Sequence, residues 1–506
     1  MKKINSILKT RTIRNATIVS IIFSFVGLSS CNNFLDEVPD NRVSLDNLNK
    51  AAQLLTNAYS TSSPAFTDWM TDDLSYTIGT IKRPHHDRLF TWADDTSDPT
   101  EQDSPVHYWS EAYNAIAHAN EVLAVLDDLP ALNDEQKAQK RAVEAEAFLT
   151  RAYAHFMLVN IFAKHYDPTT ASSDLGIPIV EKPETTFIAT YNRNTVQEVY
   201  DFVEQGIIKG ISLVDDTFYA NSGKYHFNKN AALAFASRFY LYKGEYQKCY
   251  DFSSELLDPE PNLYVRNLNS DKYQGSNISS FPQIYSSPNE RANLMLMRKI
   301  SLIQRSDFAF GVETNFYFFL FITTSPFGED QRENAVVKGE DGALPNRYEN
   351  LFQRSSLNSN VGTPYHIAIA FRGEEVLLNR AESALHLGRQ TQAIADLQTL
   401  TNNRYAVTNP SETALTVNSI LSHFVISNVP MFSDNQTQGI FNYLLDERRK
   451  EFLIQGLRWF DIRRFDLEIE HTTPQGTFTL TANDPRKVLQ IPKTAIDVGG
   501  LEPNPR

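Results

Sequence analysis

The chain has 506 residues, 42% of them hydrophobic and 11% aromatic, and a formal net charge of −14. A chain of this length can form two to four domains or one large helical assembly. The negative charge argues against a nucleic-acid partner, because phosphate binding needs a basic face and the only basic cluster of the sequence lies at the N-terminus.

Residues 1–30 have the pattern of a secretory signal peptide. The apolar stretch ATIVSIIFSFVGLSS follows a basic segment that contains Lys2, Lys3, Lys9, Arg11 and Arg14. The stretch is too short for a typical membrane-spanning helix, and charged residues flank it on its N-terminal side only. The sequence therefore predicts that this segment is removed and that the rest of the chain is soluble and exported.

Cys31 directly follows the small residues that end this segment, and Leu28-Ser29-Ser30-Cys31 resembles a bacterial lipoprotein signal. In such signals the thiol is acylated and the cysteine becomes the new N-terminus, where acyl chains hold the protein on a membrane. The alternative is a secreted protein with a disulfide between Cys31 and Cys249. We favour lipidation at Cys31, because this cysteine abuts a cleavage site. Cys249 is then expected to be a small buried side chain on a helix.

Helical periodicity dominates the remaining sequence. We expect paired helices within residues 46–60, 108–166, 195–257, 365–402 and 438–465. Segments 241–257 and 385–400 resemble each other, with Gly244 aligned on Gly388, and each reads as a helix, a glycine-centred turn and a second helix. This is the pattern of tetratricopeptide (TPR) units, which stack on one another to bury their apolar faces.

Long stretches rich in Gly, Pro, Ser, Asn and aromatics separate the helical segments. They cover residues 61–105, 167–194, 258–364, 403–437 and 466–506, and short strands are expected at 477–482 and 487–492. The predicted fold is therefore mainly α: about four TPR-like helix pairs form a solenoid-like scaffold, covered by long irregular loops and a few short strands.

Several segments, in this order, resemble the SusD/RagB family of outer-membrane nutrient-binding lipoproteins. They are residues 31–59, 107–123, 141–163 with LGIPIV after them, 444–466 and 491–505. One departure is the tail, which reads Glu502-Pro503-Asn504-Pro505 where the family often has Gln-Asn-Pro. The resemblance implies one SusD-like domain over residues 31–506. It also implies a surface lipoprotein, held in outer-membrane lipid through Cys31, that caps a TonB-dependent (SusC-like) outer-membrane transporter and hands it oligomeric nutrient, usually glycan.

Several charged clusters are candidates for sites of chemistry. Residues 444–466 are expected to fix the fold through ion pairs along one helix, with Phe452, Trp459 and Phe460 packed inward. His107, Glu111 and His118 share one helix face, but the gap of seven residues before His118 is too long for a metal site. His85-His86 and the acid-rich residues 93–103 are expected to be exposed loop. Glycosidase acids among Asp72-Asp73 and residues 93–103, or a Ca²⁺ site in 93–103, stay alternatives.

The ligand-binding residues are expected in the loop regions 61–105 and 258–364, because sugar rings stack on aromatic faces while their hydroxyls bond to amides and carboxylates. The candidates are Trp69, Tyr76 and Trp92 in the first region and Tyr273, Gln274, Asn277 and Tyr285 in the second. We expect oligosaccharide capture and delivery, without a cofactor, a metal or catalysis. The alternatives are a peptide-binding importer subunit of the same architecture, a surface glycosidase and a TPR scaffold for proteins.

Overall fold

The computed structural model describes residues 45–76, 84–94, 96–185, 190–305, 310–312, 316–317, 319–323, 328–339, 342–407 and 414–506. Nearly all of them belong to one compact unit, Asp46–Arg506. The predicted signal segment and Cys31 lie outside the described residues. Within the described ranges, no helix is both long enough and apolar enough to cross a membrane.

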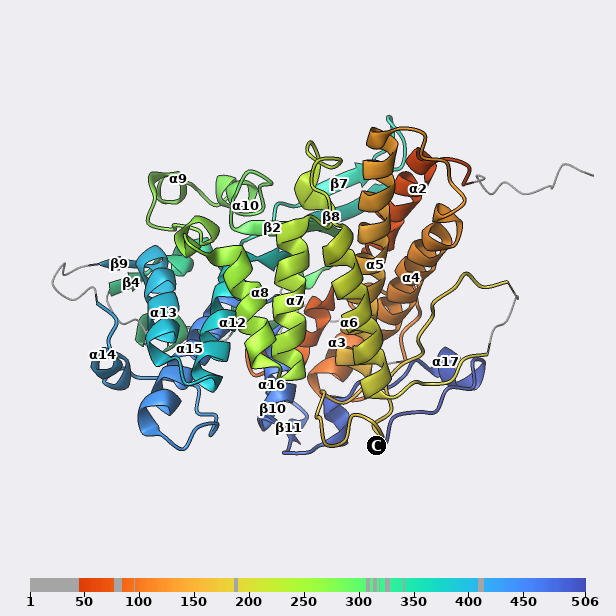
Figure 1. Ribbon diagram of the computed structural model, residues 1–506. Helices are drawn as coiled ribbons and strands as arrows, with labels where there is room; N and C mark the ends of the chain where they lie inside the picture. Colours follow the sequence, from red (N-terminus) through yellow and green to blue (C-terminus); the bar gives the residue numbers. More distant parts are fainter. Residues whose placement is uncertain are drawn as a thin grey trace, which may run out of the picture. The chain divides into compact units, whose positions relative to one another are not determined.

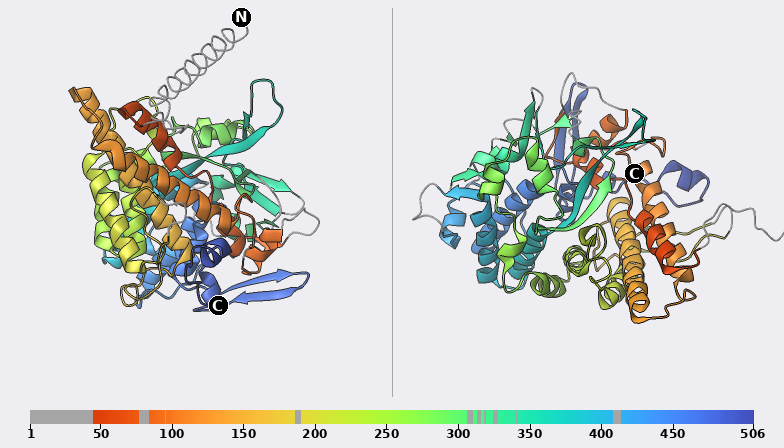
Figure 2. Two further views of the ribbon diagram at one scale, coloured as in Figure 1. Left: turned by 90° about the vertical axis from the view of Figure 1, so that its right-hand side faces the viewer. Right: turned by 90° about the horizontal axis from the view of Figure 1, so that it is seen from above.

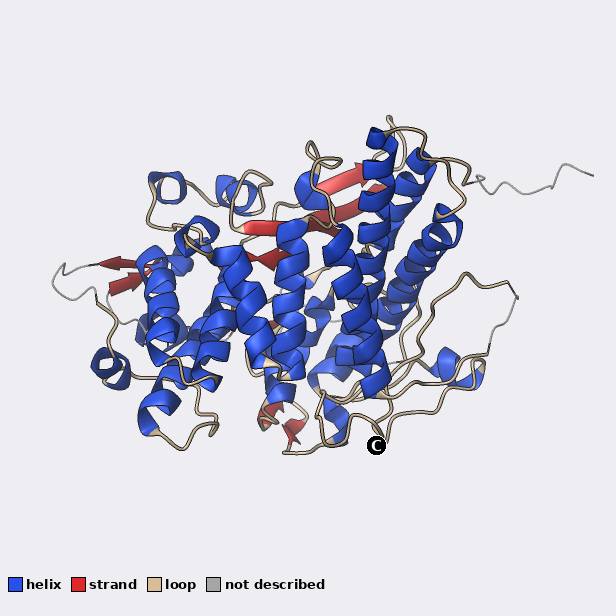
Figure 3. Ribbon diagram, viewed as in Figure 1, coloured by secondary structure: helices blue, strands red, loops and turns tan. Residues whose placement is uncertain are grey.

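A layer of helices forms the scaffold of this unit (Figures 1 and 3). Its members are α2 (Leu48–Leu55), α4 (Pro105–Leu126), α5 (Asp134–Phe162), α6 (Val196–Leu213), α7 (Lys229–Lys243), α8 (Tyr246–Leu257), α12 (Gly373–His386), α13 (Gln390–Arg404) and α15 (Asn435–Phe452). Each helix packs beside the next along the series α4, α5, α6, α7, α8, α12 and α13. This arrangement confirms a mainly helical scaffold of paired helices.

Side-chain caps explain where several of these helices begin. Ser104 and Asn133 accept hydrogen bonds from backbone N–H groups in the first turns of α4 and α5. Thr195 and Glu198 form a reciprocal capping box at α6. Such caps satisfy N–H groups that have no partner within the helix, and each contributes about 1 kcal/mol. The start of α5 at Asn133 therefore follows directly from the local sequence.

The two glycines aligned in the sequence occupy equivalent turns. Gly244 joins α7 to α8 with φ of 75°, and Gly388 joins α12 to α13 with φ of 72°. A side chain at such a φ is costly, so glycine is the residue that ends the first helix of each pair. Cys249 is buried in α8 and forms no disulfide within the described residues, which confirms its predicted packing role.

A three-stranded antiparallel sheet lies on one side of the helical layer (Figure 2). Its order is β2 (Asn293–Lys299), β8 (Gly362–Arg372) and β7 (Leu351–Arg354). The prediction of helix from residue 365 was therefore wrong over 365–372. The alternating sequence of this stretch pairs with β2, which brings Arg298 opposite Ile367. Tertiary pairing with a strand far away in sequence decides its conformation.

The remaining strands form two-stranded pairs. These are β1 (Ser75–Tyr76) with β3 (Phe310–Gly311), β4 (Gly328–Asp330) with β9 (Tyr405–Val407), β5 (Val336–Gly339) with β6 (Gly342–Pro345), and β10 (Ile469–Thr473) with β11 (Gly476–Leu480). The strand expected at 477–482 is confirmed as β11. The one expected at 487–492 was wrong, because this stretch runs against the end of α5, where the N–H of Leu489 donates to the carbonyl of Ile161.

Short helices complete the structure between these elements. They are α3 (Pro84–Phe90), α9 (Asp271–Gln274), α10 (Ser280–Tyr285), α14 (Val417–Leu421), α16 (Arg458–Arg464) and α17 (Lys493–Asp497), together with 3₁₀ segments that include η2 (Pro64–Met70) and η3 (Gly223–Tyr225). Helix α3 corrects the expectation of an exposed loop at His85-His86. Both histidine side chains are buried, and the His86 ring lies 3.9 Å from the Trp69 ring.

The charged residues of 444–466 form a buried ionic network, as expected for a structural segment, but the segment is split into α15 and α16 and most of its ion pairs reach other segments instead of running along one helix. Lys450 pairs with Glu447 at 2.9 Å within α15. Arg332 pairs with Glu447 at 2.9 Å and with Glu451 at 3.0 Å, and Arg404 reaches Glu451 at 2.6 Å. The network therefore joins α15 to segments distant in sequence. The aromatic residues predicted to pack inward, Phe452, Trp459 and Phe460, are buried.

Candidate functional site

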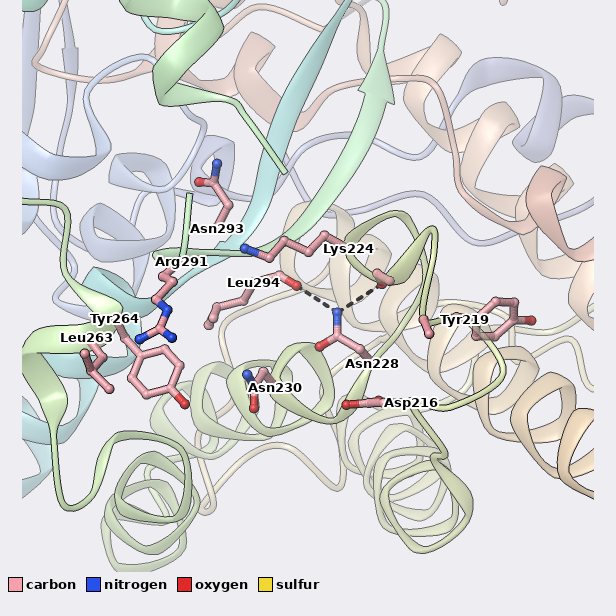
Figure 4. Close-up of a pocket in the computed structure, with 12 residues that line it drawn as sticks. Asp216, Tyr219, Lys224, Asn228, Asn230, Leu263, Tyr264, Arg291, Asn293 and Leu294 are labelled. Atoms are coloured by element: carbon pink, nitrogen blue, oxygen red, sulfur yellow. Dashed lines mark hydrogen bonds between the residues drawn. The ribbon is translucent and has the colours of Figure 1, made fainter. Parts of the chain in front are cut away.

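Residues 214–228, here called the crossing segment, run from α6 to α7 and separate two neighbouring hollows. The first hollow has a volume of about 470 Å³ and is lined by Asp216, Tyr219, Ala220, Gly223, Lys224, Asn228, Asn230, Leu263, Tyr264, Arg291, Asn293 and Leu294 (Figure 4). The second has a volume of about 620 Å³ and is lined by Thr56, Asn57, Tyr59, Ser60, Thr61, Glu111, Asn114, His118, Tyr225, His226, Leu296, Met297 and Arg298. Strand β2 continues from one to the other, so the hollows are adjacent.

A buried carboxylate holds the crossing segment in place. Glu146 of α5 is 1% exposed and accepts hydrogen bonds from the Tyr59 and Tyr219 hydroxyls. Its third contact is the Nδ1 atom of His226, at 2.7 Å. The Tyr219 and His226 rings stack with their centroids 3.9 Å apart. Tyr219 faces the first hollow, while Tyr59 and His226 face the second, so one carboxylate organises the wall between them.

Burial and the nearby charge of Glu146 together raise the pKa of the Tyr59 hydroxyl well above its ordinary value. The same two causes raise the pKa of the Tyr219 hydroxyl. Both phenols therefore stay protonated at physiological pH and remain donors to Glu146. The two phenols therefore keep anchoring the wall to Glu146.

The second hollow combines aromatic, amide and charged groups. Tyr225 at the end of η3 is 40% exposed, so part of this aromatic residue is open to solvent. Glu111 accepts a hydrogen bond from the Thr61 hydroxyl at 3.2 Å, and Asn114 lies one turn further along α4. The Arg298 guanidinium lies 4.5 Å over the ring of Tyr365. Such a mixture suits a ligand with both apolar faces and hydroxyl groups.

The first hollow is more strongly charged. Arg291 and Lys224 supply two cations, and Asp216 supplies the only carboxylate among its described lining residues. Tyr264 and Leu263 contribute apolar surface beside Arg291 (Figure 4). Asn228 is fully used by the fold, because its amide donates to the carbonyls of Gly223 and Leu294 and its oxygen caps α7.

Four of the seven residues predicted to bind ligand lie in the core instead. They are Trp69, Trp92, Tyr273 and Tyr285. The Trp92 Nε1 donates to the carbonyl of Met70 at 3.0 Å, and the Tyr273 hydroxyl donates to Glu290 at 2.6 Å. The Tyr285 ring lies 4.1 Å beneath the Arg266 guanidinium. These rings offer no open face to a ligand, so the structure gives them packing roles.

The other three predicted residues are more accessible, but they do not line a common hollow. Tyr76 is half-buried in β1, and Gln274 is exposed while it donates to the carbonyl of Leu268 at 2.7 Å. Asn277 is exposed and accepts from the backbone N–H groups of Ser279 and Ser280. None of the three lines either hollow beside the crossing segment. Ligand contact by these residues stays a prediction.

The acid-rich residues 93–103 are mostly exposed, as expected for a solvated loop. The exception is Asp103, whose carboxylate is buried and accepts from the backbone N–H of Leu302. Burial raises the pKa of Asp103 to about 6. In the described ranges, no group of three or more His, Cys, Asp or Glu side chains is arranged to hold a metal ion.

The sequence interpretation missed the hollows because the predicted ligand loops were 61–105 and 258–364, whereas the short break between the helices expected within 195–257 was not considered as a site. The stretch Asp215-Asp216-Thr217 and the later Gly223 are turn-forming residues that interrupt this pattern. Asn228, a favourable N-cap, marks where the next helix begins. These signals predict a loop between α6 and α7. They do not predict that α4 and β2 meet it.

Comparison with known proteins agrees with this architecture. The family model described as "Starch-binding associating with outer membrane" matches residues 33–241, and the model of the "SusD family" matches residues 341–493. A SusD-like protein of Formosa agariphila is 21% identical to this chain, over 92% of this chain and 94% of its own length.

Solved structures share the fold at low sequence identity. A SusD superfamily protein from Bacteroides thetaiotaomicron has a TM-score of 0.64 at 20% identity, covering 91% of this chain and 100% of that protein. Surface glycan-binding protein A from Bacteroides uniformis has a TM-score of 0.63 at 17% identity, covering 90% and 99%. The stacked helix pairs with their accompanying sheet thus define a scaffold of the SusD type. The chain belongs to the SusD/RagB family.

Proposed function

We propose that this protein binds oligosaccharides at the two hollows beside the crossing segment and delivers them to a TonB-dependent transporter in the outer membrane. The observation that carries the binding proposal is the lining of the second hollow, where the partly exposed Tyr225 lies among the amide and carboxylate groups of Asn114 and Glu111. A sugar ring presents C–H faces to an aromatic ring and hydroxyls to such polar groups.

The comparisons support the same ligand class. The family model that matches residues 33–241 is described as starch-binding, and one structural relative is named a surface glycan-binding protein. The proposal includes attachment to outer-membrane lipid through Cys31, because the sequence around Cys31 resembles a lipoprotein signal. It also includes delivery to a transporter, which the resemblance to the SusD/RagB family implies. A Cys31→Ala variant should then leave the membrane fraction for the soluble fraction.

We propose binding without turnover. A glycosidase needs two carboxyl groups roughly 5–10 Å apart on either side of the scissile bond. The described residues that line the second hollow include one carboxylate, Glu111, and those that line the first include one, Asp216. Glu146 lies between the hollows, but its oxygens are engaged by Tyr59, Tyr219 and His226.

Isothermal titration of the purified full chain in detergent, against panels of oligosaccharides and of peptides, tests the proposal. We expect binding within the sugar panel, and a Tyr225→Ala variant should bind about tenfold more weakly, a loss of about 1.4 kcal/mol. The matched control is Phe424→Ala, which removes a 58% exposed ring outside both hollows and should leave affinity unchanged. Binding of peptides with silence across the sugar panel would favour a peptide importer instead.

A further inference from the structure

Three cations interact with Glu290, which directly precedes Arg291, a lining residue of the first hollow. Glu290 accepts a hydrogen bond from the Lys272 ammonium at 2.8 Å, and the positive charge of Arg266 also acts on it. The ammonium of Lys224 reaches only the backbone carbonyl of Glu290, at 2.5 Å. Arg291 follows Glu290 in sequence and is exposed. Glu290 pairs directly with Lys272, so its charge does not neutralise Lys224 and Arg291 as well.

Two of these cations are already committed to the fold. Arg266 is buried and pairs with Glu374 at 2.8 Å, and Lys272 pairs with Glu290. By contrast, Arg291 makes no hydrogen bond or ion pair with any residue that the structure describes. The guanidinium of Arg291 and the ammonium of Lys224 both belong to the lining of the first hollow (Figure 4).

The charges of Lys224 and Arg291 act on each other. Burial and the positive charges of Arg266, Arg291 and Lys272 lower the pKa of Lys224 to about 8. The negative charge of Glu290 acts in the opposite direction but does not outweigh them. Two like charges at one hollow repel each other, and an anion bound near both would remove that repulsion. A guanidinium also presents parallel N–H donors that match the oxygens of a carboxylate or a sulfate.

The other lining groups suit a sugar better than a free anion. The Asp216 carboxylate accepts from the backbone N–H of Lys229 at 2.8 Å, and its second oxygen is available to a hydroxyl donor. The side-chain amide of Asn230 has no hydrogen-bond partner among the described residues. Tyr264 supplies a half-buried ring beside Arg291 (Figure 4). Since Asp216 would repel a second anion, the hollow can take one charged group with neutral hydroxyls next to it.

We propose that the first hollow recognises an acidic sugar unit, whose carboxylate or sulfate binds Arg291 and Lys224 while its hydroxyls bind Asp216 and Asn230. This inference rests on the proposed function and narrows its ligand to anionic oligosaccharides. The volume of about 470 Å³ is within the range of pockets that hold small ligands.

Titration of the full chain with matched oligosaccharides tests this specificity. The probes are uronic-acid oligomers, the same oligomers with their carboxylates reduced to alcohols, sulfated oligomers, and acidic peptides. We expect an acidic oligomer to bind at least tenfold more tightly than its neutral counterpart, with affinity falling as salt is added. Comparison of the uronic-acid oligomers with the sulfated oligomers shows whether the hollow binds a carboxylate or a sulfate.

Two variants test whether Arg291 and Lys224 cause the preference for acidic oligomers. Arg291→Gln and Lys224→Gln should each reduce the preference for the acidic oligomer about tenfold while leaving the melting temperature unchanged. Lys229→Gln is the matched control, because it removes an exposed charge next to the hollow that does not line it. Wild-type affinity should also fall as pH rises past 8, where Lys224 loses its proton, and this fall should be absent in Lys224→Gln.

The outcomes separate this inference from the function on which it rests. Equal binding of acidic and neutral oligomers, with no effect of Arg291→Gln, would overturn the inference and leave oligosaccharide binding intact. Tighter binding of acidic peptides than of any sugar would overturn the sugar assignment. Silence of every sugar would overturn both the inference and the proposed function.

Discussion

Replacement of Glu146 by alanine tests whether a buried carboxylate holds the wall between the two hollows. Three donors converge on this side chain: the Tyr59 hydroxyl, the Tyr219 hydroxyl and the Nδ1 atom of His226. Alanine removes the acceptor and leaves these groups without their partner in a site that is almost closed to water. The crossing segment then loses the contacts that anchor it to α5.

The magnitude follows from the number and kind of these bonds. A hydrogen bond to a charged group contributes about 1.5–3 kcal/mol, but the variant also removes the cost of burying the charge. We therefore expect Glu146→Ala to lower the free energy of unfolding by about 3–5 kcal/mol. For a unit of this length the entropy of unfolding is about 1 kcal/mol per degree, so the melting temperature should fall by about 3–5 °C.

Thermal unfolding and hydrogen exchange together provide the assay. The matched control is Glu144→Gln on the same helix, where a partly exposed Glu144 lies 3.5 Å from Lys209, and this variant should change stability by less than about 0.5 kcal/mol. Glu146→Ala should also speed amide exchange in residues 214–228. A melting temperature within 1 °C of wild type (about 1 kcal/mol), with unchanged exchange in this segment, would refute the reasoning.

Three further predictions concern the scaffold. Gly388→Ala should destabilise the protein by about 1–2 kcal/mol in a urea titration, because φ is 72° there. Gly223→Ala is the control and should be near neutral, because an added Cβ would meet no atom within 4 Å and φ lies outside the left-handed region. Burial opposes ionisation of Glu447, but the charge of Arg332 outweighs it and lowers the pKa of Glu447 to about 2. The stability that ionised Glu447 contributes to the fold is complete above pH 4.5 and is lost as pH falls toward 2, so the urea midpoint should drop over that interval. An unchanged midpoint at pH 3 would contradict this prediction. Burial raises the pKa of the Cys249 thiol to about 11, so a thiol reagent should label it only in urea, and rapid labelling of the native protein would contradict its burial.

The sequence predicted those parts of the fold that local residues determine. Gly244 and Gly388 end equivalent helices, because a positive φ depends on residues within one turn. Residues 365–372 were assigned to a helix because their strand partner, β2, lies far away in sequence. No local pattern distinguishes that case from a buried helix.

The candidate site could not be predicted from sequence to the same extent. Trp69 and Trp92 stand in a polar stretch that resembles a binding loop, yet both rings pack in the core. An aromatic residue that binds a sugar and one that fills a core have the same local sequence, and only tertiary contacts separate them. The second hollow is lined by α4, the crossing segment and β2, and the first by the crossing segment, the start of α7 and residues 263–264 and 291–294, so Tyr225 and Arg291 become lining residues of neighbouring hollows only after folding.

A crystal structure of the protein with a bound oligosaccharide would test the central claim most directly, because it locates the ligand. The structure predicts that a sugar ring lies in the hollows beside residues 214–228, with an acidic group within hydrogen-bond distance of Arg291 and Lys224 and a second ring against Tyr225. A sugar bound elsewhere, for example against the separate hollow lined by Arg88, Asp98 and Glu101, would contradict this account of the binding site.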